Sequence, residues 1–189
     1  MEAAPSHSQL DAVSASATTS QPSVPVGKTI DSGALIAFVS GHMDITPEQL
    51  AQHYLPRLDK ALAQGHLFVI GDAKGVDASA LAYLLSQSDK YPDIRQRITV
   101  HLSRPQRLSE YQVMGVRTEC TSERYDKKDP RARHLNRDAR MTQASEYDIL
   151  WARTEAEEKV FYGQKWRPRM SATEMNRLRR LEAGKQADG

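Results

Sequence analysis

The chain is poor in cysteine: Cys120 is the only one among its 189 residues. A single cysteine excludes an internal disulfide framework and a cysteine-rich zinc site, and it fits a reducing compartment. We expect Cys120 to be a free surface thiol rather than a nucleophile. The six histidines lack the HxxH and HExxH spacings of metal-binding helices, so neither a metal site nor a cofactor is expected.

Long apolar runs and an excess of one charge are also missing. No run approaches the roughly 18 apolar residues that cross a bilayer, which predicts a soluble protein without a membrane partner. The 26 Lys and Arg nearly balance the 24 Asp and Glu, for a net charge of +2. This balance argues against nucleic acid as a partner. A hydrophobic fraction of 39% predicts a core for one domain and not for two.

Residues 1–30 contain little that a fold can bury. They are rich in Ser, Thr, Ala and Pro, a composition that predicts a disordered tail. Lys28 is the first basic residue, so this stretch resembles neither a secretory signal nor a mitochondrial transit peptide, and we expect a cytoplasmic protein. Polar, serine-rich leaders also occur on effectors that specialised bacterial secretion systems export, which is the alternative localisation.

Residues 31–184 alternate short apolar runs with helical patterns. This order predicts an α/β, Rossmann-like domain of three layers, with a parallel sheet of four to five strands and helices on both faces. Thr46 and Gln49 form a capping box that opens the first helix, and Pro56 predicts a break in it. The expected strands are 34–39, 66–70, 98–102 and 148–152, and the further helices are 76–85, 136–145 and about 171–181.

The stretch from Ser103 to Leu135 fits neither pattern. It is rich in arginine, poor in apolar residues and interrupted by Pro105, Gly115 and Pro130. A loop of this length inside a compact domain is usually functional or disordered. We therefore predict a partly ordered loop near the functional site.

In open parallel sheets, ligands bind beyond the carboxyl ends of the strands. The first candidate segment at that edge is Ser40-Gly41-His42-Met43-Asp44. Gly41 permits a tight turn or the close approach of a ligand. Ser40, His42 and Asp44 supply a hydroxyl, an imidazole and a carboxylate. In the alternative interpretation, Asp44 and Thr46 only organise the turn and cap the helix.

The second candidate is the strand-to-helix loop Gly71-Asp72-Ala73-Lys74-Gly75-Val76-Asp77. Gly71 and Gly75 allow backbone amides to face an anion, and the helix dipole and Lys74 favour a phosphate there. Asp77 suits a contact to a sugar hydroxyl or to the glycosidic carbon. The loop matches neither GxGxxG nor GxxxxGK[ST]. The alternative is an ordinary turn with an acidic residue in the first turn of the helix.

The third candidate is Asn136-Arg137-Asp138-Ala139-Arg140-Met141, before the last strand. Arg137 and Arg140 lie three residues apart on a helix, a spacing that suits a phosphate clamp. The alternative is a solvated helix face with an internal pair to Asp138.

Together these segments resemble the SLOG superfamily, Rossmann-like domains related to cytokinin-activating phosphoribohydrolases and to DNA-processing protein A. Residues 71–77 are similar to the family's Gly-Gly-Ala-Lys/Arg-Gly-Ala-Asp loop. Arg137-Asp-Ala-Arg-Met141 before Tyr147-Asp-Ile-Leu-Trp151 is similar to its Arg-Asn-…-Met…Ala-Asp helix and strand. Ser40-Gly41-His42 stands where members carry a Gly-Ser/Gly-Arg turn. The resemblance covers roughly residues 34–152.

The resemblance implies a protein that handles a nucleotide or nucleoside, by cleavage or transfer at the N-glycosidic bond. Asp77 is then the leading catalytic carboxylate, with Asp72 and Asp44 as further candidates. Lys74, Gly75 and Arg140 are expected at the phosphate, and Ser40 and His42 beside the base. Members often dimerise through helices that flank the sheet, so a homodimer is an expected assembly.

The chain departs from the family pattern at two places. Asp72 replaces the second glycine of the family's pair, either as an added polar contact or as a block to close phosphate approach, and the carboxylates of Asp72 and Asp77 favour the enzyme. The phosphoribohydrolases also rely on a Pro-Gly-Gly-x-Gly-Thr-x-x-Glu loop that this chain lacks, and this absence favours another function. The alternative function is therefore a non-catalytic module that senses a nucleotide and reports it to a partner. A third is nucleic-acid binding, as in DNA-processing protein A, through the arginine-rich stretch and the C-terminal basic residues.

Overall fold

A computed structural model describes residues 33–120 and 130–187. The predicted tail, residues 1–30, lies outside these ranges. The strands are β1 (Ile36–Val39), β2 (Leu67–Gly71), β3 (Ile98–Leu102), β4 (Arg117–Cys120) and β5 (Tyr147–Ile149). The helices are α1 (Pro47–His53), α2 (Leu55–Ala63), α3 (Val76–Ser86), α4 (Ile94–Arg97), α5 (Leu108–Val113), α6 (Pro130–Gln143), α7 (Glu155–Tyr162) and α8 (Ala172–Ala187). Two 3-10 turns, η1 (Pro105–Arg107) and η2 (Gly163–Lys165), complete the elements.

The described strands form one parallel sheet in the order β4-β3-β2-β1-β5. β1 lies between β2 and β5: Phe38 is in register with Val69 on one side and with Asp148 on the other. From β1 to β4 each strand is added on the same side of its predecessor, and β5 then returns to the far side of β1. The predicted α/β fold with a parallel sheet is confirmed.

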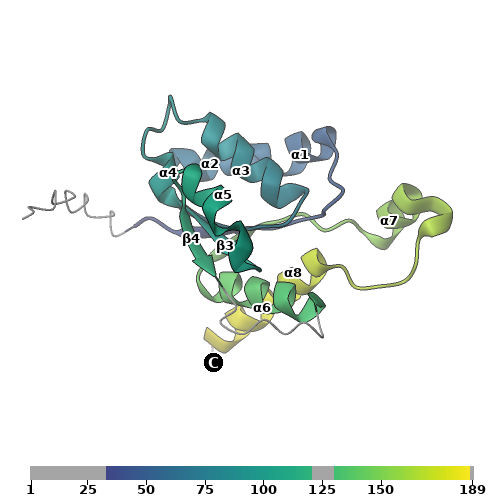
Figure 1. Cartoon of the computed structure of the whole chain (residues 1–189). Coiled ribbons are helices and arrows are strands. Elements are labelled where there is room, and N and C mark those ends of the chain that lie inside the picture. Colours follow the sequence, from purple (N-terminus) through teal and green to yellow (C-terminus); the bar gives the residue numbers. More distant parts are fainter. Residues whose placement is uncertain (1–32, 121–129, 188–189) are drawn as a thin grey trace, which may run out of the picture. The chain divides into compact units, whose positions relative to one another are not determined.

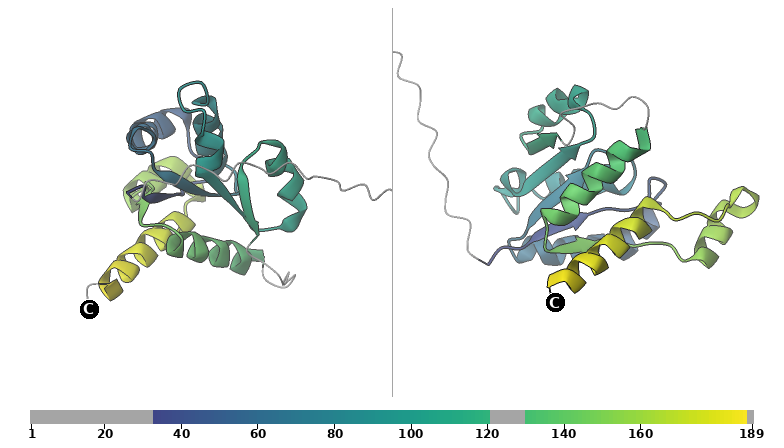
Figure 2. Two further views of the ribbon diagram at one scale, coloured as in Figure 1. Left: turned by 90° about the vertical axis from the view of Figure 1, so that its left-hand side faces the viewer. Right: turned by 90° about the horizontal axis from the view of Figure 1, so that it is seen from below.

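Helices cover both faces of the sheet. Figure 1 shows α1 to α5 above it and α6 and α8 below it, and in Figure 2 α6 and α8 cross the lower face side by side. The helices between β1 and β4 share one face because right-handed crossovers in one direction all place their helix on the same side. The return crossover to β5 carries α6 and therefore occupies the other face.

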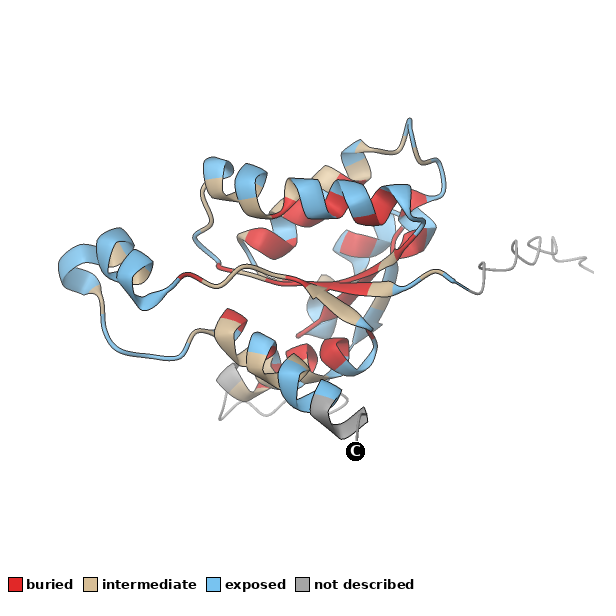
Figure 3. Cartoon of the chain, turned by 180° about the vertical axis from the view of Figure 1, so that it is seen from behind, coloured by how far each residue is buried: buried red, intermediate tan, exposed pale blue. Residues whose placement is uncertain are grey.

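The core lies mainly between the sheet and the upper helices, where Figure 3 shows the buried residues of the sheet and the inner helix faces in red. Alternate residues of β1 serve the two faces. Ala37 and Val39 belong to the large upper cluster, and Phe38 packs below with Val69 and with Met141 of α6. Both faces of β1 are thus covered, which explains its continuous apolar run.

Local signals in the sequence set several boundaries. Thr46 and Gln49 make both hydrogen bonds of the capping box at α1. The predicted break between the two helices is present, but it falls at Tyr54, two residues before Pro56, which stands in the first turn of α2. α2 is followed by Gly65 at φ 75°, a left-handed conformation that glycine adopts without strain.

The stretch 103–135 was wrongly predicted to be a loop. Its described part contains η1, α5, the edge strand β4 and the beginning of α6 at Pro130, six residues before the predicted start at Asn136. β4 is largely exposed and its sequence is Arg-Thr-Glu-Cys, so no apolar alternation marks it. α5 has six residues, too few to show a helical period.

The last strand is also shorter than predicted. β5 ends at Ile149, and Leu150 to Arg153 continue past the sheet as an irregular segment before α7. Because the strand order reverses between β1 and β5, the rule for open α/β sheets places a ligand beyond the carboxyl ends of these two strands. Within the described ranges, no helix is both long enough and apolar enough to span a membrane.

Candidate functional site

The loop between β2 and α3 folds back against the segment after β1. The amide of Val76 donates to the His42 carbonyl oxygen at 3.1 Å. Gly75 precedes α3 at φ 74°, and a Cβ atom there would lie 2.3 Å from the same oxygen. Glycine at position 75 is therefore required by the packing of these two loops, whether or not a ligand approaches.

Inside this loop, Asp77 takes the place that an external anion would occupy. Its Oδ2 accepts a hydrogen bond from the Ala73 amide at 3.2 Å. A Cβ atom at Gly71 would lie 2.3 Å from the same Oδ2, so the missing side chain makes room for this carboxylate. Asp77 is 5% exposed. The anion-binding loop expected from the sequence thus holds a carboxylate of the chain itself.

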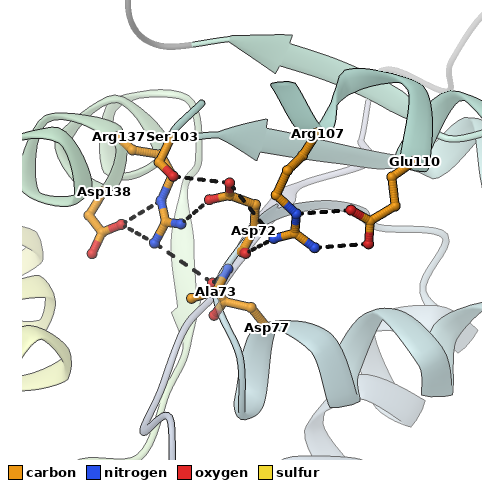
Figure 4. Close-up of polar contacts among 8 residues, drawn as sticks. All are labelled: Asp72, Ala73, Asp77, Ser103, Arg107, Glu110, Arg137 and Asp138. Carbon is orange, nitrogen blue, oxygen red and sulfur yellow. Dashed lines mark hydrogen bonds and ion pairs between the residues drawn. The ribbon is translucent and has the colours of Figure 1, made fainter. Parts of the chain in front are cut away.

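Arg137 of α6 lies at the centre of a buried group of carboxylates (Figure 4). Its Nη1 is 2.5 Å from Asp72 Oδ1, and its Nη2 is 3.7 Å from Asp77 Oδ2. Nε and Nη2 both donate to Asp138 Oδ1, at 3.0 and 2.8 Å. All four side chains are at least nine-tenths buried. We call them the Arg137 cluster.

Neighbouring elements complete the Arg137 cluster. Ser103, just after β3, donates to Asp72 Oδ2 at 3.0 Å. Arg107 of η1 donates to the Asp72 carbonyl oxygen and pairs with Glu110 (Figure 4). Asn176 of α8 donates to Asp138 Oδ2 at 3.2 Å. The cluster therefore ties both helix layers to the carboxyl edge of the sheet.

Three buried carboxylates around one buried guanidinium shift the pKa values of the cluster. Burial raises the pKa of Asp77 to about 6; the nearby carboxylates of Asp138 and Asp72 add to this rise, and Arg137 opposes it. Burial alone lowers the pKa of Arg137, but the three carboxylates outweigh it and raise that pKa. Arg137 therefore stays charged at any physiological pH, and Asp77 is the group poised to take up a proton.

The crevice between β1 and β5 is filled by Tyr54. Its hydroxyl lies 3.1 Å from the Ser40 carbonyl oxygen and 3.3 Å from that of Trp151, and it accepts from the Trp151 amide at 3.1 Å. A Cβ atom at Gly41 would lie 2.2 Å from the same hydroxyl. The phenol thus occupies the gap in which open α/β sheets commonly hold a ligand.

Beside this crevice, Arg153 organises the turn that carries His42 and Asp44. The amide of Arg153 donates to His42 Nε2 at 3.0 Å, and its Nη1 donates to Asp44 Oδ1 at 2.7 Å. Tyr162 of α7 donates to the other oxygen of Asp44 at 2.5 Å. Burial and the charge of Arg153 lower the pKa of His42 to about 4, so this imidazole is neutral at pH 7.

A hollow of about 660 Å³ opens past the end of β5. One wall is the irregular segment 150–154 with the first turns of α7, and the other is 166–171 with the first turns of α8. We call it the β5–α8 pocket. It lies at the carboxyl edge of the sheet, next to the strand pair where the order reverses.

The structure separates the predicted site residues into groups. Gly71, Asp72, Asp77 and Arg137 meet in the Arg137 cluster, and His42 and Asp44 meet at Arg153; the contact of Gly75 with His42 joins the two groups. The side chain of Ser40 is buried, and its Oγ has no partner among the described residues. Arg137 and Arg140 do not share one helix face as the predicted phosphate clamp requires, because Arg137 is buried and Arg140 is exposed. Lys74 is also exposed.

Sequence reasoning missed Arg153, Ser103 and Tyr54. The first two directly follow predicted strands, so the rule that ligand-edge residues follow strand ends would have found them. Tyr54 carried no such signal, because a tyrosine within an apolar helical pattern is indistinguishable from an ordinary core residue.

Comparisons with protein-family models, with curated proteins and with solved structures find no match for this chain. They neither support nor contradict the resemblance to the SLOG superfamily. Among the described residues, no group of three or more His, Cys, Asp or Glu side chains is placed to hold a metal ion.

Proposed function

We propose that the protein binds a nucleotide or nucleoside at the carboxyl edge of its sheet, as a sensing module that does not cleave its ligand. One observation carries this choice: the three carboxylates expected to do chemistry are engaged by side chains of the protein itself. Asp72 and Asp77 belong to the Arg137 cluster, and both oxygens of Asp44 are bonded to Arg153 and Tyr162.

Cleavage of an N-glycosidic bond passes through an oxocarbenium-like centre, which a carboxylate stabilises from close range. Asp77 is 5% exposed and Asp72 is 6% exposed, so neither presents a free oxygen to an anomeric carbon. Displacing Arg137 from them would leave charges buried without a partner, which costs roughly 3–5 kcal/mol. The cluster is thus suited to holding the loop in place.

The nucleotide class rests on the resemblance of the loop 71–77 and of the α6 segment to SLOG domains. The fold agrees with it, because the segments after β1 and β2 lie at the carboxyl edge of a parallel sheet, and Arg137 of α6 reaches the loop after β2. The phosphoribohydrolase loop ends in Thr-x-x-Glu, and Thr154 and Glu157 are the only pair in this chain with that spacing. Here the two side chains cap α7: Thr154 Oγ1 accepts from the Glu157 amide, and the Glu157 carboxylate accepts from the Thr154 amide.

A second candidate function is N-glycosidic cleavage, and the pKa of Asp77 favours it. A carboxyl with a pKa of about 6 is partly protonated near neutrality, which is the state a general acid needs. This function requires that ligand binding move Arg137 or the loop to open Asp77.

One experiment separates the two functions. The full chain is incubated with a panel of nucleosides, nucleotides and NAD; free base is measured by chromatography, and Tm is measured with the same ligands. A sensing module raises Tm with at least one ligand and releases no base. Base released by the wild type and not by Asp77→Asn would instead establish the enzyme, and no released base together with a Tm unchanged by every ligand would refute both functions.

A further inference from the structure

Both tryptophans of the chain line the β5–α8 pocket. Trp151 follows β5, and one of its faces is covered by a stacked His53 ring at 4.0 Å. Trp166 precedes α8, and its Nε1 is buried without a hydrogen-bond partner in the described part of the chain. Cationic groups also lie over these rings, Lys159 Nζ at 4.7 Å from the Trp166 centroid and Arg153 Cζ at 5.7 Å from the Trp151 centroid. The remaining indole surface is flat and suits stacking with a planar ring, a contact that is favourable for any nucleobase.

The pocket also contains charged side chains that have no ion-pair partner among the described residues. Two of its three glutamates are neutralised nearby, since Glu155 pairs with Lys159 and Glu174 with Arg177, each at 2.6 Å. Glu158 and Arg169 also line the pocket, and neither side chain makes an ion pair or hydrogen bond with the described residues. One free acceptor and one free cation therefore face the same hollow.

The other wall of the pocket includes the start of α8. Ser171 and Glu174 line the pocket there, and Ser171 Oγ accepts from the Glu174 amide at 3.1 Å. The N-terminus of a helix of this length attracts an anion. A second, independent donor lines the pocket: Arg153 is 6% exposed, and its Nε has no partner among the described residues.

From these groups we infer that the β5–α8 pocket is the ligand site, and that its ligand combines a planar ring, an amino group on that ring and an anionic group. The ring stacks on the indoles, Glu158 accepts from the amino group, and Arg169 with the start of α8 binds the anion. Aminated nucleoside monophosphates have this chemistry. The inference takes the class of ligand from the proposed function. It adds the location of the binding site and the side chains that select the ligand.

The test uses the two tryptophans as the probe, because their fluorescence reports the pocket directly. The full chain is titrated with adenosine monophosphate, inosine monophosphate and adenosine. The second ligand replaces the amino group with a carbonyl, and the third lacks the phosphate. We expect adenosine monophosphate to change the emission and to bind about tenfold tighter than inosine monophosphate or adenosine. A difference of this size corresponds to one charge-assisted hydrogen bond or ion pair.

Two variants assign the contacts. Glu158→Gln keeps the shape and adds a donor, so it should reduce the preference for the amino ligand over the carbonyl one about tenfold. Arg169→Gln should reduce the preference for the monophosphate over adenosine while the amino preference remains. The matched controls are Glu48→Gln on α1 and Lys60→Gln on α2, which lie outside the pocket lining and should change neither preference.

The outcomes distinguish this inference from the proposed function. If the ligands raise Tm but leave the fluorescence and both preferences unchanged, the ligand binds elsewhere; the inference is then wrong and the proposed function stands. If they bind in the pocket without regard to the amino group or the phosphate, the inferred chemistry is wrong. If neither Tm nor fluorescence responds to any nucleotide, both proposals are refuted.

Discussion

At the scale of the residue, Arg137 is the side chain whose removal we expect to destabilise the fold most. It is a buried cation within ion-pair distance of Asp72, Asp77 and Asp138, so removing it leaves three carboxylates without their shared partner. Breaking a buried pair from one side is far more costly than breaking an exposed pair, which contributes about 0–1 kcal/mol.

We predict that Arg137→Met lowers the free energy of unfolding by roughly 3–5 kcal/mol. The matched control is Arg140→Met, three residues further along the same helix, where the side chain is exposed and the expected change is within about 0.5 kcal/mol. Urea unfolding of the three proteins measures both values. Similar small losses for the two variants would show that the cluster does not hold the fold together.

Asp77 makes stability depend on pH in an unusual direction for a carboxyl. Its pKa rises from 3.8 to about 6 on folding, chiefly because of burial, so the folded chain binds this proton more tightly than the unfolded chain does. Its contribution to stability is therefore fully present below pH 4 and is lost as the pH rises through about 6.

The prediction concerns the difference between the wild type and Asp77→Asn, in which other titrating groups cancel. From pH 4 to pH 7 the wild type should lose about 2–3 kcal/mol of unfolding free energy relative to the variant. Asparagine keeps an oxygen for the Ala73 amide, which makes the comparison conservative. Parallel stability profiles of the two proteins over this pH range would contradict the raised pKa.

Two glycines with positive φ differ in what a Cβ atom would meet. Gly65 and Gly75 have φ of 75° and 74°, but a Cβ atom meets nothing within 4 Å at the first and lies 2.3 Å from the His42 carbonyl oxygen at the second. Gly65→Ala should cost about 1–2 kcal/mol, the strain of the left-handed conformation alone. Gly75→Ala should lower Tm much further, because its ψ of −124° is unfavourable for alanine and its Cβ would meet the His42 carbonyl oxygen. Equal losses would refute the tight contact between the two loops.

At the scale of the element, Tyr54 joins the carboxyl ends of β1 and β5. Its hydroxyl contacts backbone groups of Ser40 and Trp151, which follow the two strands between which the order reverses. Burial raises the pKa of this phenol to about 12, so it remains a neutral donor. α1 and α2 are thereby tied to the edge at which the ligand is proposed to bind.

We expect Tyr54→Phe to lower the unfolding free energy by about 1–3 kcal/mol, because it leaves the buried Ser40 carbonyl oxygen without this donor and the partly buried Trp151 amide without its acceptor. Tyr83→Phe is the control, since its hydroxyl bonds to Asp59 at an exposed position and should contribute less. Thermal and urea unfolding of both variants give the comparison. A loss at Tyr54 no larger than the loss at Tyr83 would mean that the hydroxyl is dispensable for the edge.

The elements that the sequence predicted correctly are those with a strong local signal. β3 was placed without error, and α1 was located by the Thr46 capping box, because apolar runs and caps depend on neighbouring residues alone. β4 and α5 were missed because an exposed edge strand and a six-residue helix have almost no apolar pattern. Their place in the fold comes from pairing with β3, which is a non-local contact.

The candidate site was predictable in part for the same reason. The sequence located the loop 71–77 and the α6 segment, but local patterns do not show that Arg137 points into the protein while Arg140 points out of it. The direction of each side chain is decided by the contact of α6 with β2 and β3, far away in sequence. The same holds for Tyr54, whose hydroxyl meets residues 97 positions away.

At the scale of the whole molecule, the carboxyl edge divides into a closed part and an open part. The Arg137 cluster, Tyr54 and the Asp44–Arg153 pair close the loops after β1 and β2 with contacts of the protein itself. The β5–α8 pocket is open, and its Glu158 and Arg169 form no ion pair within the described part of the chain. This division is the basis for proposing a ligand-binding module in which the loop 71–77 is a support for the site.

A crystal structure of the full chain grown with adenosine monophosphate tests this account most directly. We predict that the ring lies against Trp151 and Trp166, with the phosphate at Arg169 and the start of α8, and that Arg137 keeps its contacts to Asp72 and Asp77. A nucleotide bound instead over the loop 71–77, with Arg137 displaced and Asp77 facing the anomeric carbon, would contradict the account and support N-glycosidic cleavage.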